Sequence, residues 1–129
     1  MNQNSLIIAA DTSRARLFRT AHPNADQTPL ELLEVEAIDR GDHDEEFRVF
    51  ARQIAERAAH FAQYHLCNPI IVSATHAVSP LLSVELEHEL PHVYVRSVSG
   101  EMASLPAPEL LDALCKREAF TPVQYPPHS

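Results

Sequence analysis

The sequence has no tryptophan, and only eight of its 129 residues are aromatic. A core built from it must therefore rely on aliphatic and alanine side chains. Its two glycines cannot form a glycine-rich loop of the kind that wraps a phosphate group. The two cysteines, Cys67 and Cys115, lie far apart and match no metal or redox spacing, so each is interpreted as a buried free thiol.

Long hydrophobic runs are also missing. The first apolar run, Leu6 to Ala10, has five residues and no basic residue before it, which does not fit a signal peptide. No segment approaches the ~20 consecutive apolar residues that a membrane span needs. We therefore expect a cytoplasmic protein with no membrane partner.

Positive charge is scarce, with 10 basic residues against 18 acidic ones and a net charge of −8. Eight of the acidic residues lie between Glu31 and Glu46, with Arg40 the only basic residue among them. A broad nucleic-acid surface needs the opposite charge balance, so none is expected. The acidic window is interpreted as a solvated edge and loop, with a protein-interaction surface as the alternative.

What the sequence does contain is a regular series of strand and helix patterns. Residues 1–120 are predicted to form a single domain, and 121–129 form a tail too rich in proline to continue a regular element. Alternating or continuous apolar patterns predict strands over 6–10, 15–20, 30–38, 69–74 and 93–98. Helices are predicted from Phe47 to the Asn68–Pro69 pair, over 77–90 and over 108–117.

The helix that begins at Phe47 carries an apolar stripe at helical spacing. Phe47, Phe50, Ile54 and Phe61 are predicted to form its main core contacts. The strand over 30–38 alternates strictly, which places Glu34 and Glu36 on one face and Val35 on the other.

The order of elements is β-β-β-α-β-α-β-α. Three strands joined by short loops should form an antiparallel meander, and the later two should add in parallel through right-handed crossovers. Placing the most apolar strand, Leu6 to Ala10, at the centre gives the sheet order 3-2-1-4-5. The sequence thus predicts an α/β ribonuclease H-like three-layer fold, with a mixed five-stranded sheet and helices on both faces.

The two edges of this predicted sheet differ in charge. The third strand, over 30–38, carries acidic residues that discourage association between edges. The fifth strand, over 93–98, has Arg96 as its only charged residue. We therefore expect a weak homodimer that forms through the fifth strand and its neighbouring helices. The alternative is a monomer in which the last helix or the proline-rich tail covers the fifth strand.

Four segments of the chain carry a family resemblance: LIIAADTSRARLF, FRVFARQIAERAA, PIIVSA and VYVRSVSGEMASLPAPELLDAL. Together they resemble the bacterial host attachment protein family (protein required for attachment to host cells). That family is similar to the middle domain of archaeal and eukaryotic peptide-chain release factors, which has a ribonuclease H-like fold. Two departures matter. The segment between the third strand and the first helix is shorter here than in the family, and the Gly-Gly-Gln tripeptide of release factors is absent.

Candidate binding residues lie at the ends of the first and fourth strands. If these strands are parallel neighbours, then Asp11, Thr12, Ser13 and His76 converge where open α/β sheets bind ligands. The alternative is that Asp11, Thr12 and Ser13 serve the hairpin turn and that His76 caps the next helix.

A small basic group follows the first strand. Arg14 and Arg16 share one strand face, and with Arg19 they form the main cluster of positive charge in this part of the chain. They could bind phosphate or carboxylate groups. The alternative is that they are solvated or paired with Glu34 and Glu36 on the acidic strand.

No catalytic residue, metal or cofactor is predicted. A ribonuclease H-like nuclease needs several carboxylates around two metal ions, and here only Asp11 and His76 lie near the central strands. The histidines match no metal-ligand spacing. We therefore expect a non-catalytic binding or adaptor protein of the host attachment family, with an unidentified protein partner. The alternatives are a translation-associated factor that docks on the ribosome or tRNA and, with less support, a small-molecule enzyme.

Overall fold

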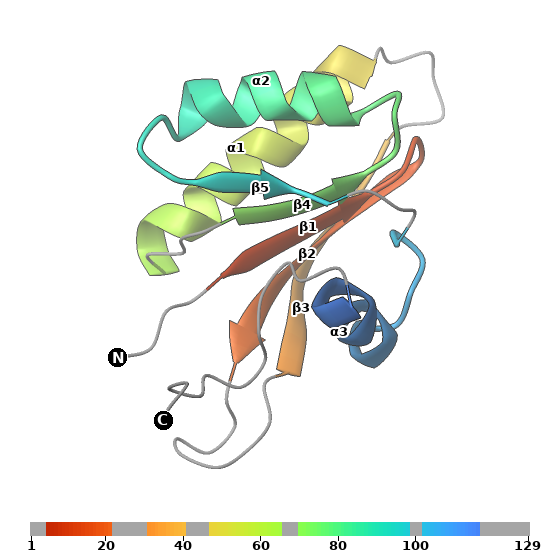
Figure 1. Ribbon diagram of the computed structural model, residues 1–129. Helices are drawn as coiled ribbons and strands as arrows, with labels where there is room; N and C mark the ends of the chain where they lie inside the picture. The colour runs from red at the N-terminus through yellow and green to blue at the C-terminus, as the bar shows by residue number, and fades with distance from the viewer. Residues whose placement is uncertain (1–4, 22–30, 41–46, 66–69, 99–101, 117–129) are drawn as a thin grey trace.

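Figure 1 shows a computed structural model of the chain, which describes residues 5–21, 31–40, 47–65, 70–98 and 102–116. The predicted tail, 121–129, the acidic connection 41–46, Cys67 and the Asn68–Pro69 helix end lie outside the described residues. In chain order the elements are β1 (Leu6–Ala10), β2 (Arg14–Ala21), β3 (Glu31–Asp39), α1 (Phe47–His65), β4 (Ile70–Ala74), α2 (Ser79–Glu89), β5 (Val95–Ser97) and α3 (Ala107–Lys116).

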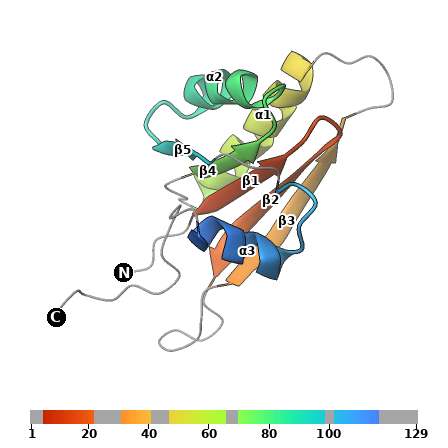
Figure 2. The same ribbon diagram turned by 45° about the vertical axis from the view of Figure 1, so that its right-hand side comes forward.

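The strands form one five-stranded sheet in the predicted order, β3-β2-β1-β4-β5. β1, β2 and β3 pair antiparallel, whereas β4 and β5 add in parallel on the other side of β1. α1 and α2 cover one face of the sheet and α3 covers the other, so that three layers form (Figures 1 and 2). Within the described residues, no helix has the length and apolarity needed to cross a membrane.

β1 connects the two cores of the molecule, because every one of its residues is buried. Leu6, Ile8 and Ala10 belong to the core beneath α1 and α2. Ile7 and Ala9 belong to the core beneath α3. Successive side chains of a strand point to opposite faces, so a continuously apolar strand is stable only where both faces are covered. The central position predicted for this strand is confirmed.

The apolar stripe of α1 is confirmed at its middle and is weaker at its ends. Phe50 and Ile54 are fully buried against the sheet. Phe47 and Phe61 are only half-buried, so the prediction that all four side chains are main core contacts is wrong for these two. Phe47 begins the helix and lies under the guanidinium of Arg40, 4.9 Å from the ring centre, while Phe61 packs at the margin of the core.

β3 contains a bulge that the alternating pattern did not predict. Leu17 on β2 pairs with Glu36, but the next residue, Phe18, pairs with Glu34, so Val35 is an extra residue. Leu17 and Phe18 belong to the cores on opposite faces of the sheet. Directly opposed residues share a face, and therefore Glu34 and Glu36 point to opposite faces. The prediction that they share one face is wrong.

β5 is shorter than the predicted strand over 93–98. The backbone N–H of Val93 donates to the carbonyl of Leu90 at 3.2 Å, which closes a turn after α2 and keeps Val93 out of the sheet. Val98 still donates to the carbonyl of Val72 at 2.8 Å, directly after the strand ends. β3 and β5 occupy the two edges of the sheet, as predicted.

Cys115 on α3 is a free thiol, as interpreted from the sequence, but it is half-buried rather than buried. Burial raises the pKa of the Cys115 thiol, and the negative charge of Asp112 raises it further. The reactive thiolate is therefore scarce at neutral pH.

Ile54 provides a test of the packing of α1. We expect Ile54→Ala to lower the free energy of unfolding by about 2–5 kcal/mol, because it leaves a cavity between α1 and the sheet. Urea denaturation followed by circular dichroism measures this change. Glu56→Ala, on the exposed side of the same helix, is the control and should change stability by less than about 0.5 kcal/mol. Equal stability of the two variants would contradict the packing described.

Candidate functional site

Asp11 organises the hairpin between β1 and β2. Its Oδ1 atom accepts hydrogen bonds from the backbone N–H groups of Ser13 at 2.7 Å and Arg14 at 2.8 Å. The backbone N–H of Asp11 donates to the carbonyl of Arg14 at 2.9 Å, which closes the turn. Aspartate is typical of such turns because its short side chain reaches the amides that follow it. Asp11 therefore serves the hairpin turn, which is the alternative that the sequence left open for it.

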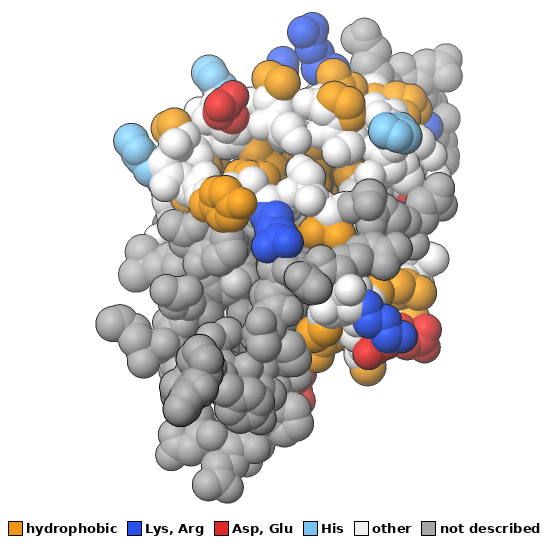
Figure 3. Space-filling model, in the orientation of Figure 1, with side chains coloured by type: hydrophobic (Ala, Val, Ile, Leu, Met, Phe, Trp, Pro, Cys, Tyr) orange, Lys and Arg blue, Asp and Glu red, His pale blue; other side chains and the backbone are white. Residues whose placement is uncertain are grey.

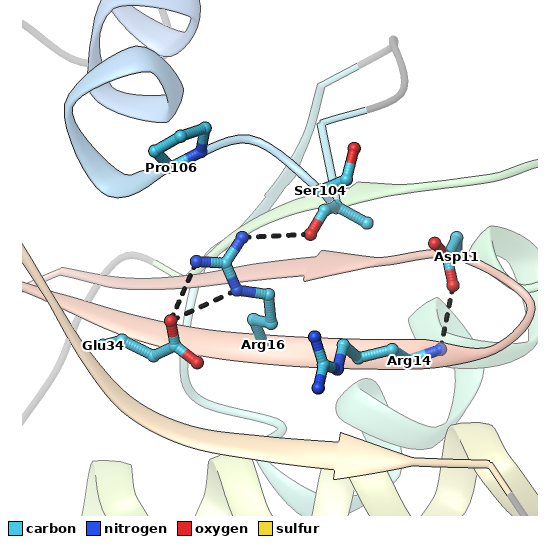
Figure 4. Close-up of a pocket in the computed structure, with 7 residues that line it drawn as sticks. Asp11, Arg14, Arg16, Glu34, Ser104 and Pro106 are labelled. Carbon is cyan, nitrogen blue, oxygen red and sulfur yellow. Dashed lines mark hydrogen bonds and ion pairs between the residues drawn. The ribbon is translucent and has the colours of Figure 1, made fainter.

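Arg16 lies on the face of β2 that α3 covers, and its side chain is only 13% exposed. Its Nε and Nη2 atoms donate to Oε1 of Glu34 at 3.2 Å and 2.8 Å. Its Nη1 atom donates to the carbonyls of Ala103 at 3.1 Å and Leu105 at 2.6 Å. The guanidinium also lies over the ring of Phe18, 4.8 Å from its centre. Arg16 thus joins β2, β3 and the segment that leads into α3 (Figure 4).

An open pocket of about 490 Å³ surrounds this arginine. Its lining consists of Asp11, Arg14, Arg16, Glu34, Ala103, Ser104 and Pro106. Two arginines and two carboxylates make the lining neutral overall. Arg14 is the more exposed arginine, and its Nε donates to Oδ1 of Asp39 at 3.2 Å. Among the described lining residues there is no histidine, cysteine or lysine. The two carboxylates of the lining accept hydrogen bonds within the fold, Asp11 from backbone amides and Glu34 from Arg16.

The structure brings three of the six predicted site residues together. Asp11, Arg14 and Arg16 line the pocket, whereas Thr12, Ser13 and His76 do not. Arg40 donates two hydrogen bonds to the hairpin. Its side chain donates to the carbonyl of Thr12, and its backbone N–H donates to the carbonyl of Ser13 at 2.8 Å. Thr12 and Ser13 thus tie the hairpin to the end of β3 and serve the turn.

His76 is exposed in the turn before α2. β1 and β4 are parallel neighbours, as the predicted convergence required. However, the residue that caps α2 is Val78, and no side chain bonds to that helix end. The expectation that His76 caps this helix is wrong, because the helix begins three residues after it. The pocket forms instead on the side of the hairpin that faces α3.

Sequence reasoning did not place Ala103, Ser104 and Pro106 at the site. These residues belong to a linker in the sequence, and only the folding of α3 onto the sheet brings them to β2. The predicted ion pair between Glu34 and the arginines of β2 is confirmed for Arg16. Glu36 pairs instead with Arg57 of α1, at 2.6 Å. The bulge at Val35 explains this division.

The described part of the chain contains no group of three or more His, Cys, Asp or Glu side chains arranged to hold a metal ion. At the pocket, Asp11 uses one carboxylate oxygen on backbone amides, and Glu34 is held by Arg16. The arrangement therefore offers hydrogen-bonding and ionic contacts at the rim, chiefly from Arg14.

Comparison with known proteins gives a likeness of fold. No family model and no curated protein matches the sequence. The solved structure of Thermus thermophilus RuvC in complex with Holliday junction substrate matches with a TM-score of 0.55 and 13% identity, over 98% of this chain and 85% of that chain. RuvC from the same organism, solved separately, matches with a TM-score of 0.53 and 13% identity, over 95% of this chain and 85% of that chain.

A third solved structure, the type II variant of the Aquifex aeolicus Ppx/GppA phosphatase, matches with a TM-score of 0.48 and 12% identity, over 76% of this chain and 36% of that chain. The RuvC likeness and the sheet order β3-β2-β1-β4-β5 confirm the predicted fold class. The chain has a ribonuclease H-like α/β fold. At 13% identity the RuvC likeness extends to the fold alone.

The contacts of Arg16 lead to a prediction about stability. We expect Arg16→Lys to lower the free energy of unfolding by about 1–3 kcal/mol, because one ammonium cannot reach Glu34 and both carbonyls together. Hydrogen exchange should also become faster at the amide of Leu110, in the first turn of α3.

Arg14→Lys is the matched control, since it lies on the same strand and the same face and forms an exposed ion pair. Its effect should be at most about 1 kcal/mol. Equal effects of the two substitutions on unfolding would show that Arg16 does not hold the segment before α3.

Proposed function

We propose that this chain is a non-catalytic binding or adaptor protein, as its resemblance to the host attachment family implies. The observation that carries the proposal is that the charged side chains around β1 and β2 form hydrogen bonds and ion pairs within the fold. Asp11 serves the hairpin turn, and Arg16 and Glu34 hold each other and the segment before α3. These contacts use one oxygen of each carboxylate within the fold and give Asp11, Arg16 and Glu34 a structural role, which favours a binding function over catalysis.

The likeness to RuvC raises nuclease activity as the competing function. RuvC was solved with a Holliday junction, which is a branched DNA substrate. Two-metal nucleases need several carboxylates that converge on the scissile phosphate. Here the carboxylate after β1 lies beside two arginines, and the turn after β4 supplies His76 rather than a carboxylate. The net charge of −8 also opposes strong attraction to a polyanion.

The translation-associated alternative depends on one basic surface formed by Arg14, Arg16 and Arg19. Arg19 lies opposite Leu6 in the register of β1 and β2, and the side chain of Leu6 belongs to the core beneath α1 and α2. Arg19 therefore points to that face of the sheet. Arg14 and Arg16 lie on the opposite face, and each has a carboxylate partner. The three arginines therefore do not combine into one positive surface, which favours the adaptor function over ribosome docking.

A cleavage assay tests the proposal against nuclease activity. The purified full chain, with Mg²⁺ or Mn²⁺, is incubated with a four-way DNA junction, duplex DNA and single-stranded DNA. We expect no cleavage above background, and the same result for Asp11→Asn. Cleavage by the wild type that Asp11→Asn abolishes would overturn the non-catalytic function.

A sedimentation assay separates the adaptor from the translation factor. Lysate is layered on a sucrose gradient at low and at rising salt, and we expect the protein to remain apart from the ribosomal fractions. Sedimentation with ribosomes at low salt that is lost in Arg14→Glu would support the translation-associated function instead.

A further inference from the structure

β5 ends the sheet with backbone groups directed outward. The carbonyl of Tyr94 accepts from the N–H of Ile70 at 2.9 Å, and the N–H of Val98 donates to Val72 at 2.8 Å. Backbone groups of alternate residues point to opposite sides of a strand. Val95 and Ser97 therefore direct their N–H and carbonyl groups away from β4, toward an edge with which no described strand pairs.

A groove of about 330 Å³ lies beside this edge, between α2 and β5. Val84, Leu90, Val93 and Val95 contribute its apolar lining, and Glu87 of α2 adds a negative charge. Figure 3 looks onto this region and shows hydrophobic side chains gathered around a hollow below α2. Among the described residues three large hydrophobic side chains are exposed, and two of them, Val84 at 63% and Tyr94 at 64%, line this groove.

The edge lacks the features that protect β3 at the other side of the sheet. β3 carries Glu31, Glu34 and Glu36, together with a bulge, and both features discourage pairing with a further strand. β5 has no proline, no bulge and no acidic residue, and its one charge is Arg96. β5 is protected only by its short length of three residues and by Arg96. An edge with which no described strand pairs, beside an apolar groove, is the arrangement to which extended peptides add as an extra strand.

Arg96 indicates which occupant fits this edge. Val95 packs toward the core beneath α1 and α2, so Arg96 points to the opposite face of the sheet. No described residue forms an ion pair with Arg96. A second copy that uses the outward groups of Val95 and Ser97 about a two-fold axis would place its own Arg96 directly opposite this one. Like charges in that position destabilise strand pairing, which disfavours the homodimer expected from the sequence.

A peptide from another protein avoids this conflict if it carries a carboxylate opposite Arg96. Its neighbouring residues then face the groove, where apolar side chains bury surface against Val84 and Val93. Glu87 would repel an acidic side chain in the groove, so the acidic residue belongs on the Arg96 face alone. The two faces together select an alternating apolar-acidic-apolar pattern.

We propose that the β5 edge binds an extended apolar-acidic-apolar segment of a partner protein as a sixth strand of the sheet. This inference rests on the proposed binding function and assigns to it a surface and a class of partner. Failure of the inference and failure of the proposed function are distinguishable, because peptide binding at β5 and DNA cleavage are measured separately.

The test uses a fluorescein-labelled synthetic peptide, Ser-Val-Thr-Val-Glu-Val-Thr-Val-Ser, and a control peptide in which Lys replaces Glu. Fluorescence anisotropy with the full chain should show saturable binding of the Glu peptide. The Lys peptide should bind about fivefold more weakly or worse, because a favourable cross-strand charge pair becomes a repulsive one. Arg96→Glu should reverse this preference, whereas Arg48→Glu, an exposed site on α1 with the same change of charge, should leave it unchanged.

A backbone substitution tests the strand pairing itself. Ser97→Pro removes one outward N–H donor at the edge and should abolish binding, while Ser97→Ala should retain it. Thermal melting checks that both variants fold. If Ser97→Pro does not fold, the reversed peptide preference of Arg96→Glu still tests the proposal. No saturable binding by the wild type, or unchanged preference in Arg96→Glu, would overturn the proposal. Light scattering that shows a dimer which Ser97→Pro dissociates would identify a second copy as the occupant and overturn it as well.

Discussion

The site depends above all on the need of a mostly buried guanidinium for polar partners. Arg16 is only 13% exposed, and a charge that has lost most of its water needs a counter-charge and hydrogen-bond acceptors in its place. Glu34 supplies the charge, and the carbonyls of Ala103 and Leu105 supply the acceptors. Because these partners come from β3 and from the segment before α3, one side chain joins three distant parts of the chain.

The bulge at Val35 makes this arrangement possible. It directs Glu34 to the α3 face and Glu36 to the α1 face, although the two residues are only two positions apart. Glu36 then pairs with Arg57 of α1 at 2.6 Å, while Glu34 pairs with Arg16 at 2.8 Å. In a regular strand both carboxylates would lie on one face, and one of the two arginines would lose its partner. A single extra residue thus distributes negative charge between the two layers of helices.

The two edges of the sheet differ in length and in charge. The β3 edge is acidic and bulged, and three of its four carboxylates, Glu34, Glu36 and Asp39, pair with arginines within the fold. The β5 edge is short, carries a single positive charge and borders an apolar groove. A ribonuclease H-like fold hosts unrelated functions, so function has to be argued from such local features rather than from the likeness to RuvC.

Local patterns in the sequence are enough to predict the elements, the sheet order and the two edges of the sheet. A five-residue apolar run such as Leu6–Ala10 is stable only when buried on both faces, and this requirement places it at the centre of the sheet. The role of Asp11 in the hairpin turn is also predictable as one of two alternatives, because the amides that it binds are only two and three residues further along the chain. Which side chains share the pocket, in contrast, depends on packing between distant segments. The register shift at Val35 depends on how β3 meets β2, and residues 103–106 reach Arg16 only because α3 packs on the far face of the sheet. Neither a register shift nor a contact across 87 residues leaves a periodic signal in the sequence, because both arise from packing between segments that are distant along the chain.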